Sequence, residues 1–359
     1  MFRCVPFVTN LQGDWEHHPQ ELPPGLNSGC KESDGLEADF SLDASQKWAS
    51  FSFISAASLK ALVVSLDEHP MYIYEVDGRY IEPQFAHSIE MYNGERYSAM
   101  VKLDKEPAPY TLRVASTGAN QVISGFAKVT YQGGEKNPRE STPYINYGGS
   151  NVSDSTPLNT SNLPPFPPVY PRAVADDFHL LTLGRINSSW EWTLDGTKFF
   201  PADMDRMEPV IFNPDSPELA SALKITTNNG TWVDLVYELR IEEPTVVQPP
   251  HPMHKHSNKA FLIGRGSGRF QWANVDEAIA ASPDDFFLDR PLYRDTFNTS
   301  PQGEAWMAVR YQVVNPGPFF LHCHMETHLH GGMGVLLLDG IDVWPEVPEE
   351  HRCRVPVIV

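Results

Sequence analysis

The tripeptide His322-Cys323-His324 constrains this chain more than any other feature of its sequence. Consecutive side chains of an extended strand point to opposite faces, so the two histidines project one way and the cysteine projects the other way. One short segment can therefore contribute to two different metal sites. A thiolate suits a site that it shares with imidazoles, whereas the two histidines suit a second site made of imidazoles alone.

Seven of the 13 histidines lie in two clusters that can complete these sites. The clusters are His251-Pro-Met-His254-Lys-His256 and the segment from His322 to Met333. A thiolate, two imidazoles and a weak thioether are the ligand set of a blue-copper electron-transfer centre. The residues that supply this set are His251, Cys323, His328 and Met333. The candidates for a second, all-imidazole copper cluster are His254, His256, His322 and His324.

The simpler interpretations of these residues are a structural zinc site, core packing and surface roles. Structural zinc sites prefer paired cysteines or a CxxC…HxxxH spacing, and neither pattern occurs here. A lone methionine is more often core filler than a ligand, but Met333 follows Cys323 by ten residues, which favours the axial role. We expect His330 to be a bystander. Six further histidines are expected to serve packing or surface roles: His17, His18, His69, His87, His179 and His351.

Length and composition favour two soluble domains built from strands. The chain has 359 residues, and its 32 prolines and 24 glycines are spread along it, which suits short strands separated by turns. The net charge of −19 disfavours nucleic acid and anionic membranes as partners. No apolar run is long enough to span a bilayer. We therefore expect an all-β fold, a sandwich or barrel in each domain.

The order of apolar and polar segments predicts where the two domains divide. Strand patterns occupy residues 48–66, 71–76, 89–103, 110–114 and 124–131, and they resume at residue 178. The stretch between is rich in Pro, Ser, Asn and Gly. We expect a first domain at 1–135, a linker at 136–175 and a second domain at 176–359. The one convincing helix is predicted near residues 275–281.

The remaining cysteines and the glycosylation signals are less informative. Cys4, Cys30 and Cys353 are too few for a disulfide framework, and their pairing stays open. Asn-x-Ser/Thr acceptors occur at five positions, which would be glycosylated on surface loops of a secreted chain: Asn151, Asn159, Asn187, Asn229 and Asn298.

The two clusters resemble the HPxHxH and HCHxxxH…M motifs of the multicopper oxidases, particularly the laccase-like enzymes of filamentous fungi. The resemblance implies Greek-key, cupredoxin-like domains and assigns the copper sites. It gives His251, Cys323 and His328 to the type 1 copper and His254 to the type 2 copper. It gives the type 3 pair three residues: His256, His322 and His324. Glu326 matches an acidic position that the family uses to deliver protons to oxygen.

The resemblance also concerns the first half of the chain. Residues 76–83 and 89–98 are similar to the middle, copper-free domain of the three-domain enzymes. The family needs eight histidines around its trinuclear cluster, and four come from an N-terminal cupredoxin domain. This sequence has HxH spacings only in its last third, so we expect that domain to be missing. The type 1 site would then be complete and the type 2 and type 3 sites half complete.

The resemblance implies a copper-dependent oxidase that takes single electrons from phenolic or polyketide-type pigment precursors and passes them to dioxygen. Small phenols and oxygen are then its partners. A ferroxidase, which requires carboxylates beside His251 or His328, is one alternative. A copper-binding fragment without oxidase activity is another. The resemblance implies a secreted or cell-wall protein, although no secretory signal is visible at residues 1–10.

Overall fold

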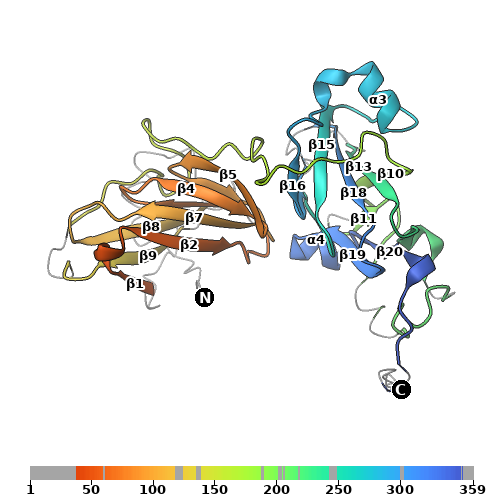
Figure 1. Cartoon of the computed structure of the whole chain (residues 1–359), viewed down its shortest axis with the longest axis horizontal. Helices are drawn as coiled ribbons and strands as arrows, with labels where there is room; N and C mark the ends of the chain where they lie inside the picture. The colour runs from red at the N-terminus through yellow and green to blue at the C-terminus, as the bar shows by residue number, and fades with distance from the viewer. Residues whose placement is uncertain are drawn as a thin grey trace. The chain divides into compact units, whose positions relative to one another are not determined.

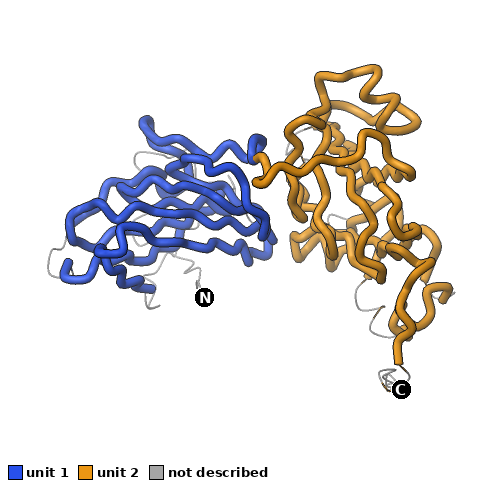
Figure 2. The backbone as a smooth tube through the Cα atoms, in the orientation of Figure 1, with its two compact units in different colours: residues 1–163 blue, residues 164–359 orange. Residues whose placement is uncertain are grey.

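The structure is a computed structural model that divides into two compact units, residues 1–163 and residues 164–359 (Figure 2). It describes the following residues: 38–59, 61–117, 124–134, 139–186, 190–200, 204, 207–216, 219–241, 249–299, 303–348 and 350. Cys4, Cys30, Cys353 and Asn187 lie outside these residues, so the expectations about them are not addressed by the structure. Each unit is described separately below.

The described residues of unit 1 form nine strands in two sheets (Figure 1). One sheet has the order β1-β9-β8-β3-β6 and the other has the order β2-β7-β4-β5. The strands are β1 Ala38–Leu42, β2 Trp48–Ile54, β3 Leu62–Leu66, β4 Met71–Val76, β5 Arg79–Ala86, β6 Ile89–Met91, β7 Arg96–Lys102, β8 Pro109–Ser116 and β9 Ser124–Tyr131, with a 3-10 helix η2 at Ala44–Gln46. Alternate residues such as Met71 and Ile73 are fully buried, as expected for strands with one face on a core. Asp77 and Gly78 both have positive φ in the tight β4–β5 turn that their sequence signals.

Part of the expected linker packs onto unit 1. Ile145 is fully buried in a cluster with Val63 and Ala115. The backbone N–H of Thr156 donates to Nδ1 of His87 at 2.9 Å. The division between the two units follows Leu163, inside the predicted linker at 136–175.

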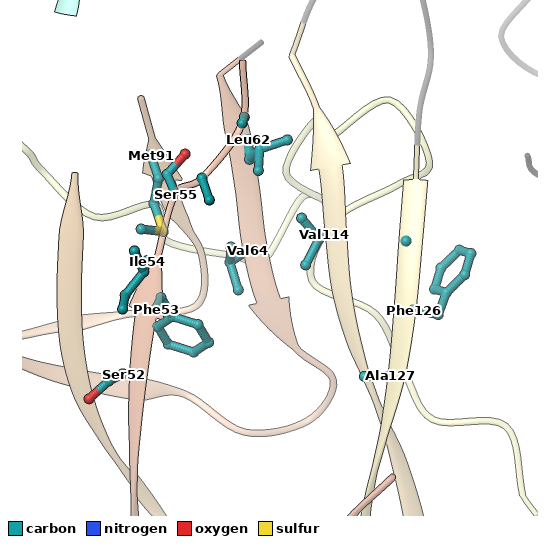
Figure 3. Close-up of a pocket in the computed structure, with 13 residues that line it drawn as sticks. Ser52, Phe53, Ile54, Ser55, Leu62, Val64, Met91, Val114, Phe126 and Ala127 are labelled. Carbon is teal, nitrogen blue, oxygen red and sulfur yellow. The ribbon is translucent and has the colours of Figure 1, made fainter. Parts of the chain in front are cut away.

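Unit 1 also contains an apolar cavity of about 390 Å³, lined by residues from both of its sheets (Figure 3). Phe53, Val64 and Val114 are among the side chains that line it. Its lining contains no histidine, cysteine or carboxylate, so it is not a metal site.

Unit 2 contains two more sheets, with the orders β11-β10-β13-β18-β15-β16 and β12-β20-β19-β14-β17. Its strands are β10 Asp177–Arg185, β11 Trp192–Leu194, β12 Lys224–Thr226, β13 Trp232–Leu239, β14 Pro252–Lys255, β15 Ala260–Ser267, β16 Leu292–Arg294, β17 Thr296–Asn298, β18 Ala305–Gln312, β19 Gly317–Cys323 and β20 Gly334–Asp339. Its helices are α3 Val275–Ala281 and α4 Glu326–His330, with 3-10 helices η3 Ser221–Leu223, η4 Pro283–Asp285 and η5 Ile341–Val343. Figure 1 shows α3 at the top of this unit, well apart from α4.

A buried ion pair ties the start of unit 2 to its first sheet. Arg310 is fully buried and donates two hydrogen bonds to the carboxylate of Asp234, at 2.6 and 2.7 Å. The same guanidinium donates to the carbonyl oxygens of Arg172 and Ala173 at 2.8 and 2.5 Å. Because every donor finds a charged or carbonyl partner, this arrangement satisfies a buried cation and fixes the chain ahead of β10.

The predicted all-β class is confirmed, and each unit is a sandwich of two sheets that do not close into a barrel. The helix predicted near residues 275–281 is confirmed as α3, with Asn274 accepting a capping bond from the Glu277 N–H. The sequence did not predict α4 or the fully paired strand β13. Among the described residues, no helix has the length and apolar character needed to cross a membrane.

Candidate metal centre

Two neighbouring strands of unit 2 carry most of the predicted ligands. Strands β14 and β19 pair antiparallel, with His254 opposite His322 and Met253 opposite Cys323. Because directly paired residues share one face of a sheet, His254 and His322 lie on one side while Cys323 lies on the other. The alternation inferred from the tripeptide therefore places its histidines and its thiol on opposite faces of β19.

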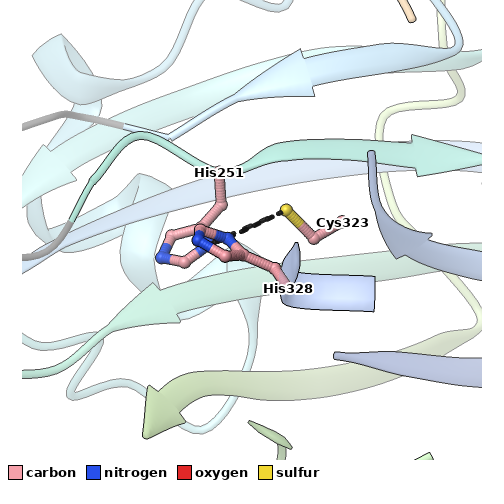
Figure 4. Close-up of side chains that lie close together, drawn as sticks. All are labelled: His251, Cys323 and His328. Carbon is pink, nitrogen blue, oxygen red and sulfur yellow. Dashed lines mark hydrogen bonds between the residues drawn. The ribbon is translucent and has the colours of Figure 1, made fainter. Parts of the chain in front are cut away.

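His251, Cys323 and His328 come together in the buried interior of unit 2, where their side chains converge (Figure 4). Cys323 Sγ lies 3.8 Å from His251 Nδ1 and 3.4 Å from His328 Nδ1, and the two Nδ1 atoms are 3.0 Å apart. The relative exposures are 0% for His251 and Cys323 and 3% for His328. His251 precedes β14, Cys323 ends β19 and His328 lies on α4, so three separate elements supply the donors.

The single turn of helix α4 explains the five-residue spacing between Cys323 and His328. The His328 N–H donates to the Met325 carbonyl at 3.0 Å, and the Met333 N–H donates to the His328 carbonyl at 3.0 Å. This turn reverses the chain after Cys323 and brings the imidazole back toward the thiol. A strand continuing for five more residues would instead carry the histidine about 16 Å away.

The spacing and chemistry of the three donors fit one first-row metal ion. Metal–ligand bonds of about 2.0–2.3 Å place neighbouring donors roughly 3–4 Å apart, which is the range found here. Burial holds the pKa of His251 well below its usual value and lowers that of His328 to about 3, so both imidazoles are neutral ligands. Burial raises the pKa of the Cys323 thiol to about 12, so metal binding must displace its proton. One thiolate with two imidazoles favours copper.

Two residues that the sequence did not single out surround this triad. The indole of Trp192 lies with its ring centroid 4.1 Å from that of His328 and 5.1 Å from that of His251. The Arg185 guanidinium lies over the same indole, 5.2 Å from its centroid. Its charge further lowers the pKa of His251 and His328, after burial. Both residues precede His251 by more than 50 positions, so no motif spacing could have revealed them.

The other four predicted ligands gather on the opposite face of the same strands. The ring centroid of His254 lies 5.0 Å from that of His256 and 5.6 Å from those of His322 and His324. The Nε2 atoms of His256 and His322 are 3.2 Å apart. His322 is buried, His256 is exposed, and the other two are intermediate. We name these four residues the histidine face.

Backbone carbonyls orient two of these imidazoles. His322 Nδ1 lies 2.9 Å from the Cys323 carbonyl oxygen and His254 Nδ1 lies 3.0 Å from that of Asp295. A carbonyl can only accept, so both Nδ1 atoms carry the hydrogen and both Nε2 atoms are left free to bind a metal. Burial lowers the pKa of His322 to about 3 and that of His254 to about 4, which keeps them neutral.

Met333, Glu326 and His330 lie around α4. Met333 is fully buried, and its carbonyl oxygen accepts from the Cys323 N–H at 3.2 Å. Glu326 is the first residue of α4 and is exposed, with its carboxylate 3.5 Å from His330 Nδ1. The axial role of Met333 and the proton role of Glu326 remain predictions.

Comparisons with known proteins point to one family. Multicopper oxidase profiles match residues 194–342 and residues 26–133. Laccase abr2 of Aspergillus fumigatus is 63% identical over 345 residues, which are 96% of this chain and 59% of that protein. The multicopper oxidase GIP1 of Gibberella zeae is 44% identical over 354 residues, 97% of this chain and 52% of that protein. The chain thus spans about half the length of the curated relatives it matches.

Solved structures show the same fold at low sequence identity. A laccase from Botrytis aclada, in its L499M variant, superposes with a TM-score of 0.71 at 16% identity, covering 94% of this chain and 62% of that chain. Fet3p, described as a multicopper oxidase that functions in iron import, gives a TM-score of 0.65 at 16% identity, covering 89% of this chain and 61% of that chain. These two likenesses support the cupredoxin-like architecture expected from the motifs.

Proposed function

Because this chain belongs to the multicopper oxidase family, we propose that it is the electron-accepting part of a laccase-like oxidase. In this proposal it takes single electrons from phenolic or polyketide-type aromatic substrates, and dioxygen is the final acceptor. The observation that carries the proposal is the buried triad of His251, Cys323 and His328, whose donors are spaced for one metal ion. Copper bound there supplies a one-electron acceptor.

The chain also offers a short covalent route between its two groups of ligands. Cys323 belongs to the triad, and the adjacent residues His322 and His324 belong to the histidine face. An electron that leaves through the sulfur reaches either imidazole through the backbone of neighbouring residues. In this role Glu326, exposed on α4, supplies protons to oxygen.

The histidine face supplies four imidazoles, and the family pattern calls for eight. We propose that the other four come from a further cupredoxin domain that packs against this face; the curated relatives are longer than this chain. The type 2 copper is then held in part by His254. The type 3 pair is held in part by three residues: His256, His322 and His324. The proposed location of the complete protein is the secreted or cell-wall fraction.

A ferroxidase function has less support. Among the described residues, the group of three or more potential metal-binding side chains within reach of one another is the triad itself, and it contains no carboxylate. Glu191, which adjoins Trp192 in the sequence, lies 3.4 Å from the ammonium group of Lys198 and forms an ion pair with it. Neither observation offers an iron(II) site beside the triad.

The test is an anaerobic half-reaction of the copper-loaded chain. We expect about one copper per chain in the triad, an intense visible band, and bleaching of this band by one equivalent of a methoxyphenol. Iron(II) should bleach it more slowly than the phenol. A chain that binds copper without a visible band, or whose band no phenol bleaches, would contradict the proposed function and favour a copper-binding fragment.

A further inference from the structure

The indole of Trp192 is in direct contact with the metal-binding triad. It is 4% exposed, and its plane is tilted by 36° to the imidazole of His328 and by 73° to that of His251. At centroid distances of 4.1 and 5.1 Å these rings are in van der Waals contact. The indole therefore restricts the orientation of both imidazoles.

The position of this indole is fixed from two sides. Trp192 pairs with Arg185 in the β10–β11 ladder, and the backbone N–H of Trp192 donates to the Gly331 carbonyl at 2.9 Å. A Cβ atom added to Gly331 would lie 2.2 Å from the Trp190 carbonyl oxygen and 2.8 Å from Cδ1 of Trp192. Only glycine lets the end of α4, which carries His328, approach β11 this closely. Strand β11 and helix α4 are thus held together beside the triad.

Arg185 brings a positive charge to the same place. Its guanidinium lies 5.2 Å from the indole centroid, and the imidazole of His328 contacts the same indole. No carboxylate of the described residues pairs with it, and its charge is not cancelled locally. The copper ligands are buried, which limits the screening of this charge, although the guanidinium itself is partly exposed. A nearby cation stabilises the reduced metal, which carries one positive charge less, and therefore raises the reduction potential.

We propose that Arg185 and Trp192 set the reduction potential of the type 1 copper, and with it the range of phenols that the oxidase accepts. Arg185 contributes the charge. Trp192 is a positioning residue that holds both the guanidinium and the ring of His328. This inference rests on the proposed function, which supplies the copper. It also identifies an influence that opposes Met333, because an axial thioether stabilises the oxidised metal and lowers the potential.

The reaction that this pair controls is a one-electron transfer. The phenol loses one electron to the copper, which changes from the +2 to the +1 state, and the hydroxyl proton passes to water. An aryloxyl radical leaves. Lowering the potential removes driving force from this step and affects the least electron-rich phenols first.

Arg185→Gln is the primary variant, measured by redox titration of the visible band of the copper-loaded chain. We expect a lower midpoint potential. We also expect the rate of anaerobic bleaching by an unsubstituted phenol, divided by the rate with a dimethoxyphenol, to fall at least about threefold relative to the unaltered chain. Arg185→Lys keeps the charge, so its midpoint potential should stay close to that of the unaltered chain. Arg269→Gln is the charge-matched control, since Arg269 lies after β15, is exposed and pairs with Glu304. It should change neither quantity.

Trp192 is tested by replacement with Phe and Leu. Trp192→Leu should lower the potential and alter the electron paramagnetic resonance spectrum of the oxidised copper, because both the cation and the imidazole lose their support. Trp192→Phe should partly restore both. An unchanged potential in Arg185→Gln, with a visible band that phenols still bleach, would overturn the inference and leave the proposed function standing. Absence of the band from the unaltered chain would instead overturn the proposed function.

Discussion

The triad and the histidine face are built from the same two strands but differ in how complete they are. The triad is closed, with exposures of 0–3%, and it receives its third donor from α4. The histidine face receives donors only from β14, β19 and the residues that follow them, and His256 at its edge is exposed. One face of a sheet can approach a metal cluster from one side only. The difference is in keeping with our proposal that electron acceptance belongs to unit 2, whereas oxygen chemistry requires ligands from a further surface.

Replacement of Cys323 by Ser should have the largest effect, because it removes the only thiol of the closed site. Serine preserves the size of the side chain but removes the soft donor, so the intense charge-transfer band should disappear completely. The fold should remain, since the substitution leaves β19 and its backbone hydrogen bonds in place. Absorption and circular dichroism spectra of the copper-loaded variant test this. A variant that stays equally blue would remove Cys323 from the site.

The second prediction tests the histidine face, the open site of the two, through oxygen consumption. The chain as given, loaded with copper, should show the type 1 band but little four-electron reduction of dioxygen, because four imidazoles cannot hold three copper ions at fixed separations. Adding a cupredoxin domain from a longer relative, covalently or in trans, should raise the copper content to about four per molecule and produce oxygen uptake with a phenol.

His256→Ala in the completed protein is the matched control for that experiment. It should abolish oxygen uptake but preserve the type 1 band and its anaerobic bleaching. Full turnover by the unaltered chain alone, with four coppers measured, would mean that the histidine face is already complete.

Replacing Met333 by Leu should have a moderate effect that is confined to the closed site. Copper should remain bound by the three strong donors, and the midpoint potential should rise because a weak donor to the oxidised metal is lost. The change is opposite in sign to that expected for Arg185→Gln. An unchanged potential in the redox titration would make Met333 a packing residue, consistent with its complete burial.

The sequence predicted the site better than it predicted the scaffold around the site. The alternation of His322, Cys323 and His324 follows from strand geometry alone, and the structure places His322 and Cys323 on opposite faces. The strands at residues 71–76 and 124–131 were also predicted with correct bounds. Helix α4 was not predicted, because five residues are too few to show helical periodicity.

The residues missed by the sequence are those whose neighbours depend on tertiary structure. Arg185 and Trp192 lie beside the triad because β10 pairs with β11 and because Gly331 permits a close approach. Neither condition leaves a pattern in the chain near His251. Ile145 was placed in the linker for a similar reason, since a single apolar residue among Pro, Ser and Asn gives no sign that it is buried.

The smallest effect is expected from Asp295→Asn, which tests what orients the His254 imidazole in the histidine face. His254 Nδ1 donates to the backbone carbonyl of Asp295 at 3.0 Å, while the carboxylate oxygen is 3.6 Å away. The substitution preserves that carbonyl, and it removes the negative charge that pairs with Lys259 at 2.9 Å, largely shielded from solvent. Copper affinity of the histidine face should therefore fall less than about threefold, against the roughly 10–100-fold loss typical when a ligand loses its orienting partner.

The affinity is best measured by titrating copper into the Cys323→Ser background, where the triad no longer contributes a thiolate. Thr296→Val is the matched variant, since its hydroxyl lies 3.1 Å from His254 Nδ1 and its loss removes the other side-chain contact of that nitrogen. If both variants bind copper almost normally, the backbone of β14 and its neighbours sets the geometry of the histidine face. A tenfold loss in Asp295→Asn alone would show that the carboxylate orients His254. The histidine face would then depend on a side-chain carboxylate for its geometry, whereas the triad contains no carboxylate.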